Sequence, residues 1–285
     1  MKTILGEVDI VGIAFNTTGD FWHFFNYAET GPAPILCHWL RGCALDTPKD
    51  NFNARPRQTI TVPVDYTAYV GKYLVTNYQY GLYMSANPGV RQPDYWLNTN
   101  FNAALQPVVG ITWDEAKAFA TWVGGRLLTE AEFERVSHNE LFYCDTHPYS
   151  ARYPIVVYGA GAINSSAWFV GNAEGKTHPV GLKNAINSRT WYKYPGGYTL
   201  QGISCYDQIG NVWQWVEDDY HDSHTGGPVD GSAWVDAPRS LYRVVKGGSF
   251  KCEEGLVRPW SRLKVLATGK ANDIGFRIIA NPGSF

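Results

Sequence analysis

The chain has 285 residues, a length that suits one large domain or two small ones. Hydrophobic residues make up 45% of it and aromatic residues 15%, and with frequent glycine and proline they indicate a loop-rich α+β domain instead of a helical bundle. The formal net charge is −2 and the basic residues are scattered, so we expect neither nucleic-acid binding nor attraction to an anionic membrane.

The N-terminal segment carries no recognisable targeting signal. Glu7 and Asp9 interrupt the stretch that would have to form the apolar core of a signal peptide. No segment is long and apolar enough to span a bilayer, so membrane insertion is not expected. We predict a cytoplasmic location, or delivery on a phage or cell surface without a signal peptide. The five cysteines are then expected as free thiols, whereas Cys37 and Cys43 could pair in an exported protein.

The first 60 residues are interpreted as an N-terminal elaboration of one domain that spans residues 1–285. No low-complexity linker separates residues 1–60 from the rest of the chain. Residues 59–64 (TITVPV) alternate between apolar and polar side chains, which predicts a half-buried strand.

Two helices are marked by capping boxes, in which a threonine is followed three residues later by glutamate. Thr112 begins such a box, apolar residues then recur at helical spacing, and a glycine pair follows, so a helix is predicted over residues 112–124. Thr129 begins a second box and predicts a helix over residues 129–138. Beyond about residue 140, frequent glycines indicate turns and short strands.

Several short motifs follow one another in an order known from one protein family. They are residues 69–77 (YVGKYLVTN), 107–116 (PVVGITWDEA), 125–134 (GRLLTEAEFE), 177–181 (THPVG), 210–215 (GNVWQW), 246–250 (KGGSF) and 275–277 (GFR). Together they resemble the signature of the formylglycine-generating enzyme family, whose domain is a variant of the C-type lectin fold. The resemblance implies an α+β, C-type lectin-like fold with a loop-rich C-terminal half, and with residues 205–216 and 243–250 in a small antiparallel sheet.

The resemblance also implies a chemistry to check, because family oxidases hold Cu(I) between two cysteines placed just after Gly-Gly-Ser. Cys252 stands at the first of these positions, and no cysteine follows at the second. One thiolate cannot form a two-sulfur site, so copper and formylglycine generation are not expected. We predict no catalytic residue, Cys252 being a candidate only if the protein is an oxidase, and we interpret this cysteine as a small buried hydrophobe.

Family members further bind a structural calcium ion around the Gly-Asn motif. The corresponding positions here are the side chains of Asp207 and Gln214 and the carbonyl groups of Gly210 and Val212. Two interpretations stay open, since these oxygens suit calcium but the same side chains can close hydrogen bonds within a turn.

Two histidines offer another metal-binding possibility. His221 and His224 lie close to Asp218 and Asp219, and histidine and carboxylate groups are common metal ligands. The surrounding residues 219–234 resemble a common surface loop of bacterial family members, so we favour a solvated loop here.

The segment before Gly275 departs from the polar loop that family enzymes carry there. Candidate ligand-binding residues in and beside it are Arg258, Trp260, Arg262, Leu263, Lys264, Val265 and Leu266. They are predicted to form an exposed patch of apolar anchors with basic neighbours. The alternative is local packing beneath the N-terminal extension.

A further group that shares this fold and signature is the variable proteins of diversity-generating retroelements. They place their diversified residues between Gly-Gly-Ser and Gly-Phe-Arg, and they need neither a metal nor a cysteine pair. Our leading hypothesis is therefore a non-catalytic protein that binds a protein or small ligand through residues 251–271, with help from the loop 218–234. The alternative is a divergent formylglycine-generating-enzyme-like oxidase acting on a peptide or small molecule. A weaker option is an accessory paralogue that binds a family substrate without converting it.

Overall fold

The structure is a computed structural model that describes residues 22–24, 36–41, 56–63, 68–137, 143–144, 160–187 and 204–281. Its helices are α2 (Asn77–Ala86), α3 (Trp113–Trp122), α4 (Glu130–Ser137) and α5 (Ala160–Ser166), with a 3-10 turn η2 (Glu254–Leu256). The first strands are β1 (Trp22–Phe24), β2 (Leu36–Arg41), β3 (Gln58–Pro63), β4 (Tyr69–Gly71), β5 (Arg126–Leu127), β6 (Tyr143–Cys144) and β7 (Ile186–Asn187). The others are β8 (Ser204–Cys205), β9 (Trp213–Asp219), β10 (Tyr242–Lys246), β11 (Arg262–Leu266), β12 (Ile274–Phe276) and β13 (Ile278–Ala280).

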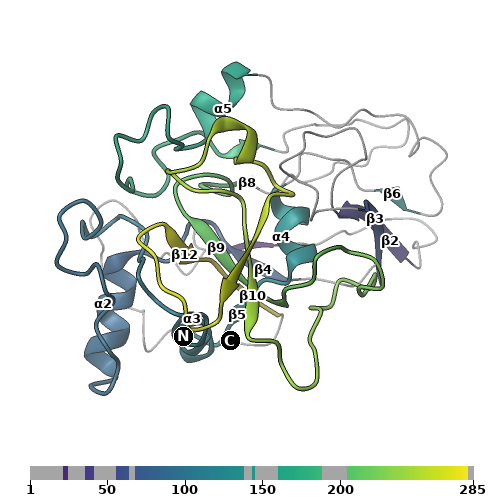
Figure 1. Ribbon diagram of the computed structural model, residues 1–285, viewed down its shortest axis with the longest axis horizontal. Helices are drawn as coiled ribbons and strands as arrows, with labels where there is room; N and C mark the ends of the chain where they lie inside the picture. The colour runs from purple at the N-terminus through teal and green to yellow at the C-terminus, as the bar shows by residue number, and fades with distance from the viewer. Residues whose placement is uncertain are drawn as a thin grey trace.

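Short strands form small sheets, and this confirms the predicted α+β, C-type lectin-like architecture. One four-stranded sheet has the order β1-β4-β13-β5 and the other the order β11-β10-β9-β12, beside a sheet β3-β2-β6 and a pair β7-β8. In Figure 1, β9 and β10 run through the middle of the molecule, with α2 and α3 to one side and α4 to the other. None of the helices in the described part of the chain has the length and apolar character needed to cross a bilayer.

The sheet that carries β9 is mostly antiparallel, as predicted for its β9–β10 pair, but its last pairing is parallel. Strand β12 runs parallel to β9, with Ile274 opposite Trp213. Trp213 and Trp215 are both buried in the core. The strand predicted from residue 205 begins only at residue 213, because the intervening residues form a tight turn with Asp207 and Gly210 at positive φ.

The two predicted helices are present with the predicted caps. The Thr112 side chain accepts a hydrogen bond from the Glu115 backbone N–H, and Thr129 does the same for Glu132. In each box the glutamate carboxylate accepts the threonine backbone N–H at 2.8 Å in return. A third box, at Thr76, begins α2 and uses glutamine in place of glutamate. Each reciprocal pair satisfies two backbone donors that a helix start would otherwise leave without partners.

Aromatic side chains join α2 and α3 to the central sheet. The Tyr80 ring stacks on Phe119 at a centroid distance of 5.7 Å, and Phe119 meets Phe276 edge to face at 5.4 Å. All three are buried, so each ring contributes both apolar area and a favourable ring geometry to the core.

The strand predicted at residues 59–64 is confirmed as β3, and the N-terminal part contacts the loop that follows β9. The buried Arg41 guanidinium donates to the Pro228 carbonyl at 3.0 Å, and the Thr61 N–H donates to the Val229 carbonyl at 2.7 Å. These contacts agree with one domain, which stays a prediction. Cys43 lies outside the described residues, so the possible Cys37–Cys43 pairing stays a prediction.

Candidate functional site

The predicted ligand-binding segment forms β11 and the turn before it, and only part of it faces solvent. Leu263, Lys264 and Leu266 are exposed, with 43% of the Leu263 surface and 44% of the Leu266 surface accessible. These three residues are compatible with the predicted binding surface. Their role as ligand contacts stays a prediction.

The expectation that Trp260 and Arg262 are exposed is wrong. Trp260 is only 7% exposed, and its carbonyl oxygen accepts a hydrogen bond from the Lys246 ammonium at 3.2 Å. The Arg262 guanidinium is buried and lies 2.8 Å from a Glu130 carboxylate oxygen. A buried carboxylate attracts a cation more strongly than water-exposed groups do, because the surrounding dielectric constant is low. This explains why Arg262 turns inward.

Arg258 and Val265 also make internal contacts. The half-buried Arg258 side chain donates to the Glu254 and Val257 carbonyl groups at 2.8 Å each. Val265 packs against the main hydrophobic cluster. Both residues therefore contact the body of the domain, and packing beneath the N-terminal extension stays a prediction.

Side chains of β11 and its neighbours form one surface, which we call the β11 face: the exposed Tyr242, Lys264 and Leu266 and the half-buried Tyr220. Leu266 lies directly opposite Tyr242 in the antiparallel β10–β11 ladder. The Lys264 ammonium lies 4.5 Å from the Tyr242 ring centroid and 5.4 Å from that of Tyr220. Tyr220 follows β9, so the loop 218–234 borders this face, and its part in ligand binding stays a prediction. The face combines apolar side chains with one cation.

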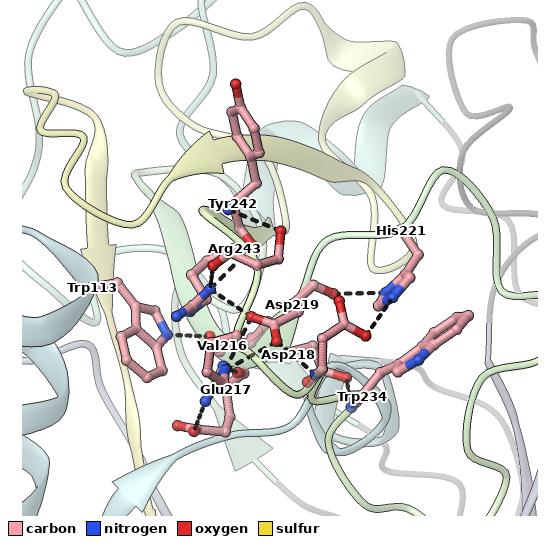
Figure 2. A network of polar contacts seen from close by, with 12 residues as sticks. Trp113, Val216, Glu217, Asp218, Asp219, His221, Trp234, Tyr242 and Arg243 are labelled. Carbon is pink, nitrogen blue, oxygen red and sulfur yellow. Dashed lines mark hydrogen bonds and ion pairs between the residues drawn. The ribbon is translucent and has the colours of Figure 1, made fainter.

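A polar network beneath the β11 face fixes the loop that carries Tyr220 (Figure 2). The Arg243 guanidinium donates to Asp219 at 2.5 Å, and its carbon lies 4.5 Å from the Trp113 ring centroid. The Trp113 indole N–H donates to the Val216 carbonyl at 2.8 Å. The Tyr242 ring points away from this network in Figure 2. Of these neighbouring residues, Arg243 therefore anchors the loop, whereas Tyr242 is exposed on the β11 face.

Asp218 holds the same loop to the start of α4. Its two carboxylate oxygens accept the backbone N–H groups of Glu130 and Trp234, at 2.7 Å and 2.8 Å. Burial, and then the negative charge of Glu130, raise the pKa of Asp218 to about 7. This carboxylate is enclosed and hydrogen-bonded, so we assign it to loop positioning.

Cys252, the candidate oxidase residue, is buried and free. Its sulfur accepts the Ser249 backbone N–H at 3.3 Å and lies 3.5 Å from the Ser249 hydroxyl oxygen. That hydroxyl donates to Asp273 at 2.8 Å. Burial raises the pKa of the Cys252 thiol, so the protonated form dominates at neutral pH. The environment suits the predicted small buried hydrophobe better than a nucleophilic thiolate.

The donor groups around Cys252 do not fit a Cu(I) ion. The Cys252 sulfur lies beside the backbone N–H and the hydroxyl of Ser249, and this hydroxyl is a hard oxygen donor. Cu(I) selects soft sulfur ligands and needs more than one of them.

The four residues predicted to bind calcium lie in and beside the turn before β9. Asp207 is buried, and its carboxylate accepts the Gly181 N–H at 2.7 Å and the Asn211 side-chain amide at 3.2 Å. Gly210 is required by the turn, because a Cβ there would lie 2.4 Å from the Trp168 carbonyl oxygen. Val212 is buried within the same segment.

Gln214, the last of the four, turns its amide nitrogen toward the turn. That nitrogen donates to the carbonyl groups of Asp207 and Gln208 at 3.0 Å each, while the amide oxygen accepts from Arg277 at 3.3 Å. Arg277 is a buried cation beside these groups. A calcium ligand would instead present the amide oxygen to the ion. The calcium assignment stays a prediction, and the contacts correspond to the turn-closing interpretation.

A cluster that the sequence did not reveal lies under β11, and we call it the buried ion-pair cluster: Glu130, Glu134, His224, Lys246 and Arg262. Glu130, Glu134 and His224 place ligand atoms within 4.8 Å of one another, a spacing that a metal ion could use. The Lys246 ammonium, however, already donates to Glu134 at 2.7 Å and to Glu130 at 3.1 Å. With Arg262 as a second cation, the two carboxylates are neutralised within the protein.

The cations determine the charge state of Glu130. Burial by itself would raise the pKa of Glu130, but the charges of Arg262, Lys246 and His224 hold it well below its ordinary value. Glu130 is therefore an anion at neutral pH, as a partner of two buried cations should be.

The solvated-loop interpretation is wrong for His224 and only partly correct for His221. His224 is buried, and its Nε2 lies 3.4 Å from a Glu130 oxygen. His221 is half-buried, stacks on Trp234 at a centroid distance of 3.6 Å and contacts Asp236 at 3.1 Å. The partners are up to 94 residues away in the chain, so a local sequence pattern could not identify them.

The comparisons with known proteins agree with this geometry. Residues 39–282 match the Sulfatase-modifying factor enzyme 1-like domain. The chain is 31% identical over 196 residues to the formylglycine-generating enzyme of Thermomonospora curvata, covering 62% of this chain but only 56% of that enzyme.

Two solved structures share the fold. PvdO from Pseudomonas aeruginosa superposes with a TM-score of 0.62 at 22% identity, covering 85% of this chain and 90% of that one. Treponema denticola variable protein 1 superposes with a TM-score of 0.61 at 18% identity, covering 92% of this chain and 95% of that one. The ordered motifs, the fold and the domain match over most of the chain lead to one conclusion: this chain belongs to the sulfatase-modifying factor enzyme 1-like family.

Proposed function

We propose that this protein is a non-catalytic binding protein whose ligand, a protein or a small molecule, contacts the β11 face. The observation that carries the proposal is the exposure of Tyr242, Lys264 and Leu266 side by side on a sheet braced from beneath. Exposed aromatic and aliphatic groups on a rigid scaffold lose little conformational entropy when a partner covers them. The use resembles that of the retroelement variable proteins, which display side chains from the same part of this fold.

The chemistry around Cys252 supports the non-catalytic assignment. Its thiol is buried and protonated at neutral pH, and its sulfur lies beside the backbone N–H and the hydroxyl of Ser249. Neither feature favours nucleophilic or copper-dependent chemistry.

The second candidate is a divergent oxidase of the formylglycine-generating type, acting on a peptide or small molecule. It is favoured by the 31% identity to such an enzyme and by the position of Cys252 after the Gly-Gly-Ser motif. The two functions can be separated by incubating copper-loaded protein with a Cys-x-Pro-x-Arg peptide and measuring the product mass. We expect no aldehyde, and an aldehyde that is lost in Cys252→Ser would establish the oxidase instead.

Binding is tested by selecting ligands from a phage-displayed library of linear and folded sequences on the immobilised protein. The matched counter-target is the Tyr242→Ser/Leu266→Ser double variant, which should keep the fold because both side chains are exposed. We expect enriched clones that bind the natural chain and lose at least about tenfold in affinity for the variant. Clones that bind both proteins equally would contradict the β11 face as the site.

For the turn at Asp207 we propose closure by hydrogen bonds, without a requirement for calcium. The Gln214 amide nitrogen occupies the space in front of two carbonyl oxygens, and the neighbouring Arg277 adds a positive charge. Both features oppose a second cation there.

A further inference from the structure

Strand β11 is the outermost strand of its sheet in the described part of the chain. The Gly247 N–H donates to the Ser261 carbonyl, and the Ala267 N–H donates to the Leu241 carbonyl. Since hydrogen-bonded pairs alternate in an antiparallel ladder, the intervening odd-numbered residues of β11 bond to β10. The backbone groups of the even-numbered residues consequently point away from the sheet.

Two residues carry this free edge. Lys264 has no backbone hydrogen bond among the described residues, so both its N–H and its C=O are open. At Leu266 the carbonyl accepts the Gly269 N–H at 2.7 Å, which leaves its N–H open. Unpaired groups of this kind are the template on which a further strand can form.

The Lys264 side chain adds a charge without a counter-ion. Its ammonium group lies over the rings of Tyr220 and Tyr242, and within the described residues no carboxylate forms an ion pair with it. Tyr242 and Leu266 provide apolar surface directly beside the ammonium group.

We propose that β11 binds an extended peptide segment, which adds to the sheet as a fifth strand and places an acidic side chain against Lys264. The residue two positions along, opposite Leu266, would lie on the same side of the strand and pack on Leu266, whose cross-strand neighbour is Tyr242. This inference rests on the proposed binding function and specifies its partner. Backbone bonds to Lys264 and Leu266 supply affinity, and the charge and the apolar contacts supply selectivity.

A second copy of this chain is a poorer occupant of the same edge. In an antiparallel pair centred on Lys264, the two lysines would face each other, and like charges in directly opposite positions are destabilising. An acidic segment removes this repulsion and replaces it with attraction.

The test uses a synthetic peptide of about seven residues, a usual strand length. Its sequence is Thr-Val-Thr-Glu-Thr-Leu-Thr. The glutamate is central, and in an extended strand the valine, glutamate and leucine side chains lie on the same side. Binding to the whole protein is measured by fluorescence anisotropy. We expect the Lys264→Glu variant to bind this peptide about fivefold more weakly, and to prefer a matched peptide with lysine in place of glutamate.

The backbone contribution is isolated by comparing Leu266→Pro with Leu266→Ala. Both variants lose the leucine side chain, but only proline removes the outward N–H, and neither removes a bond to β10. We expect the proline variant to bind the peptide about tenfold more weakly than the alanine variant. Unchanged circular dichroism and melting temperature confirm that both remain folded.

The outcomes separate the two proposals. Equal peptide affinity of the proline and alanine variants, or of the natural chain and Lys264→Glu, would overturn strand addition. If library selection still yields ligands that require Tyr242 and Leu266, the proposed binding function would remain supported although strand addition is wrong. If neither the peptide nor any selected ligand depends on these residues, both proposals fail.

Discussion

Arg262 and Lys264 stand two residues apart on one side of β11, and their surroundings give them opposite roles. Both cations lie near the ring of Tyr220, at 4.9 Å and 5.4 Å from its centroid. Arg262 continues inward to Glu130, whereas Lys264 ends at the surface between two tyrosines. The difference is the buried carboxylate, not the residue type or its position in the strand.

The buried ion-pair cluster maintains the fold, whereas the β11 face can change which ligand it binds. In the buried ion-pair cluster, each charge depends on its partners, because an unpaired charge in the interior is very costly. On the β11 face, side chains can vary with little effect on stability. The following predictions test this division.

The largest effect is expected for Lys246→Met, which removes the ammonium group shared by Glu130 and Glu134. Breaking a buried ion pair on one side costs about 3–5 kcal/mol of unfolding free energy. The matched control is Lys264→Met, which should change it by about 0.5 kcal/mol or less. Urea unfolding followed by tryptophan fluorescence measures both, and similar losses in the two variants would refute the division.

Trp260→Ala should affect stability instead of ligand binding alone. Because the side chain is only 7% exposed, its removal leaves a cavity that costs about 3–5 kcal/mol. The exposed Leu263→Ala is the control, with an expected change of about 0.5 kcal/mol or less. If the Trp260→Ala protein were as stable as the natural chain, the assignment of Trp260 to the buried core would be wrong.

The loss of unfolding free energy at acidic pH should depend on Glu130. Its pKa is lowered in the folded state by Arg262, Lys246 and His224 against the effect of burial, from an ordinary value of 4.5. The stabilisation is therefore complete above about pH 4.5 and is lost as the pH falls through the lower folded-state pKa.

We expect the difference in unfolding free energy between the natural chain and Glu130→Gln to shrink as the pH falls below about 4.5 and Glu130 takes up a proton. Urea titrations at several pH values measure it, with Glu253→Gln as a surface control. If this difference in unfolding free energy grew as the pH fell, the pKa of Glu130 would be raised in the folded state instead of lowered.

The smallest effect is expected for calcium. If hydrogen bonds close the turn at Asp207, the melting temperature should be the same with calcium and with chelator. Asp207→Ala should lower it equally under both conditions, because the bonds from Gly181 and Asn211 are lost. A calcium-dependent rise that disappears in Asp207→Ala would establish the ion site instead.

Local sequence signals predicted the parts of the fold that depend on neighbouring residues. The capping boxes at Thr112 and Thr129 satisfy backbone groups only three residues away, so a short pattern fixes them. The ordered motifs identified the fold, and the position of Cys252 without a second cysteine already argued against the family's copper chemistry.

Tertiary structure alone decided which side chains of residues 258–266 are displayed. Trp260, Arg262 and Leu266 belong to one short segment, yet the first two are buried and Leu266 is exposed, because their neighbours come from distant parts of the chain. The Arg262 partner is 132 residues away, and the Lys246 partners are 112 and 116 residues away. Sequence patterns report local geometry, whereas the exposure of a charge depends on what the whole fold places around it.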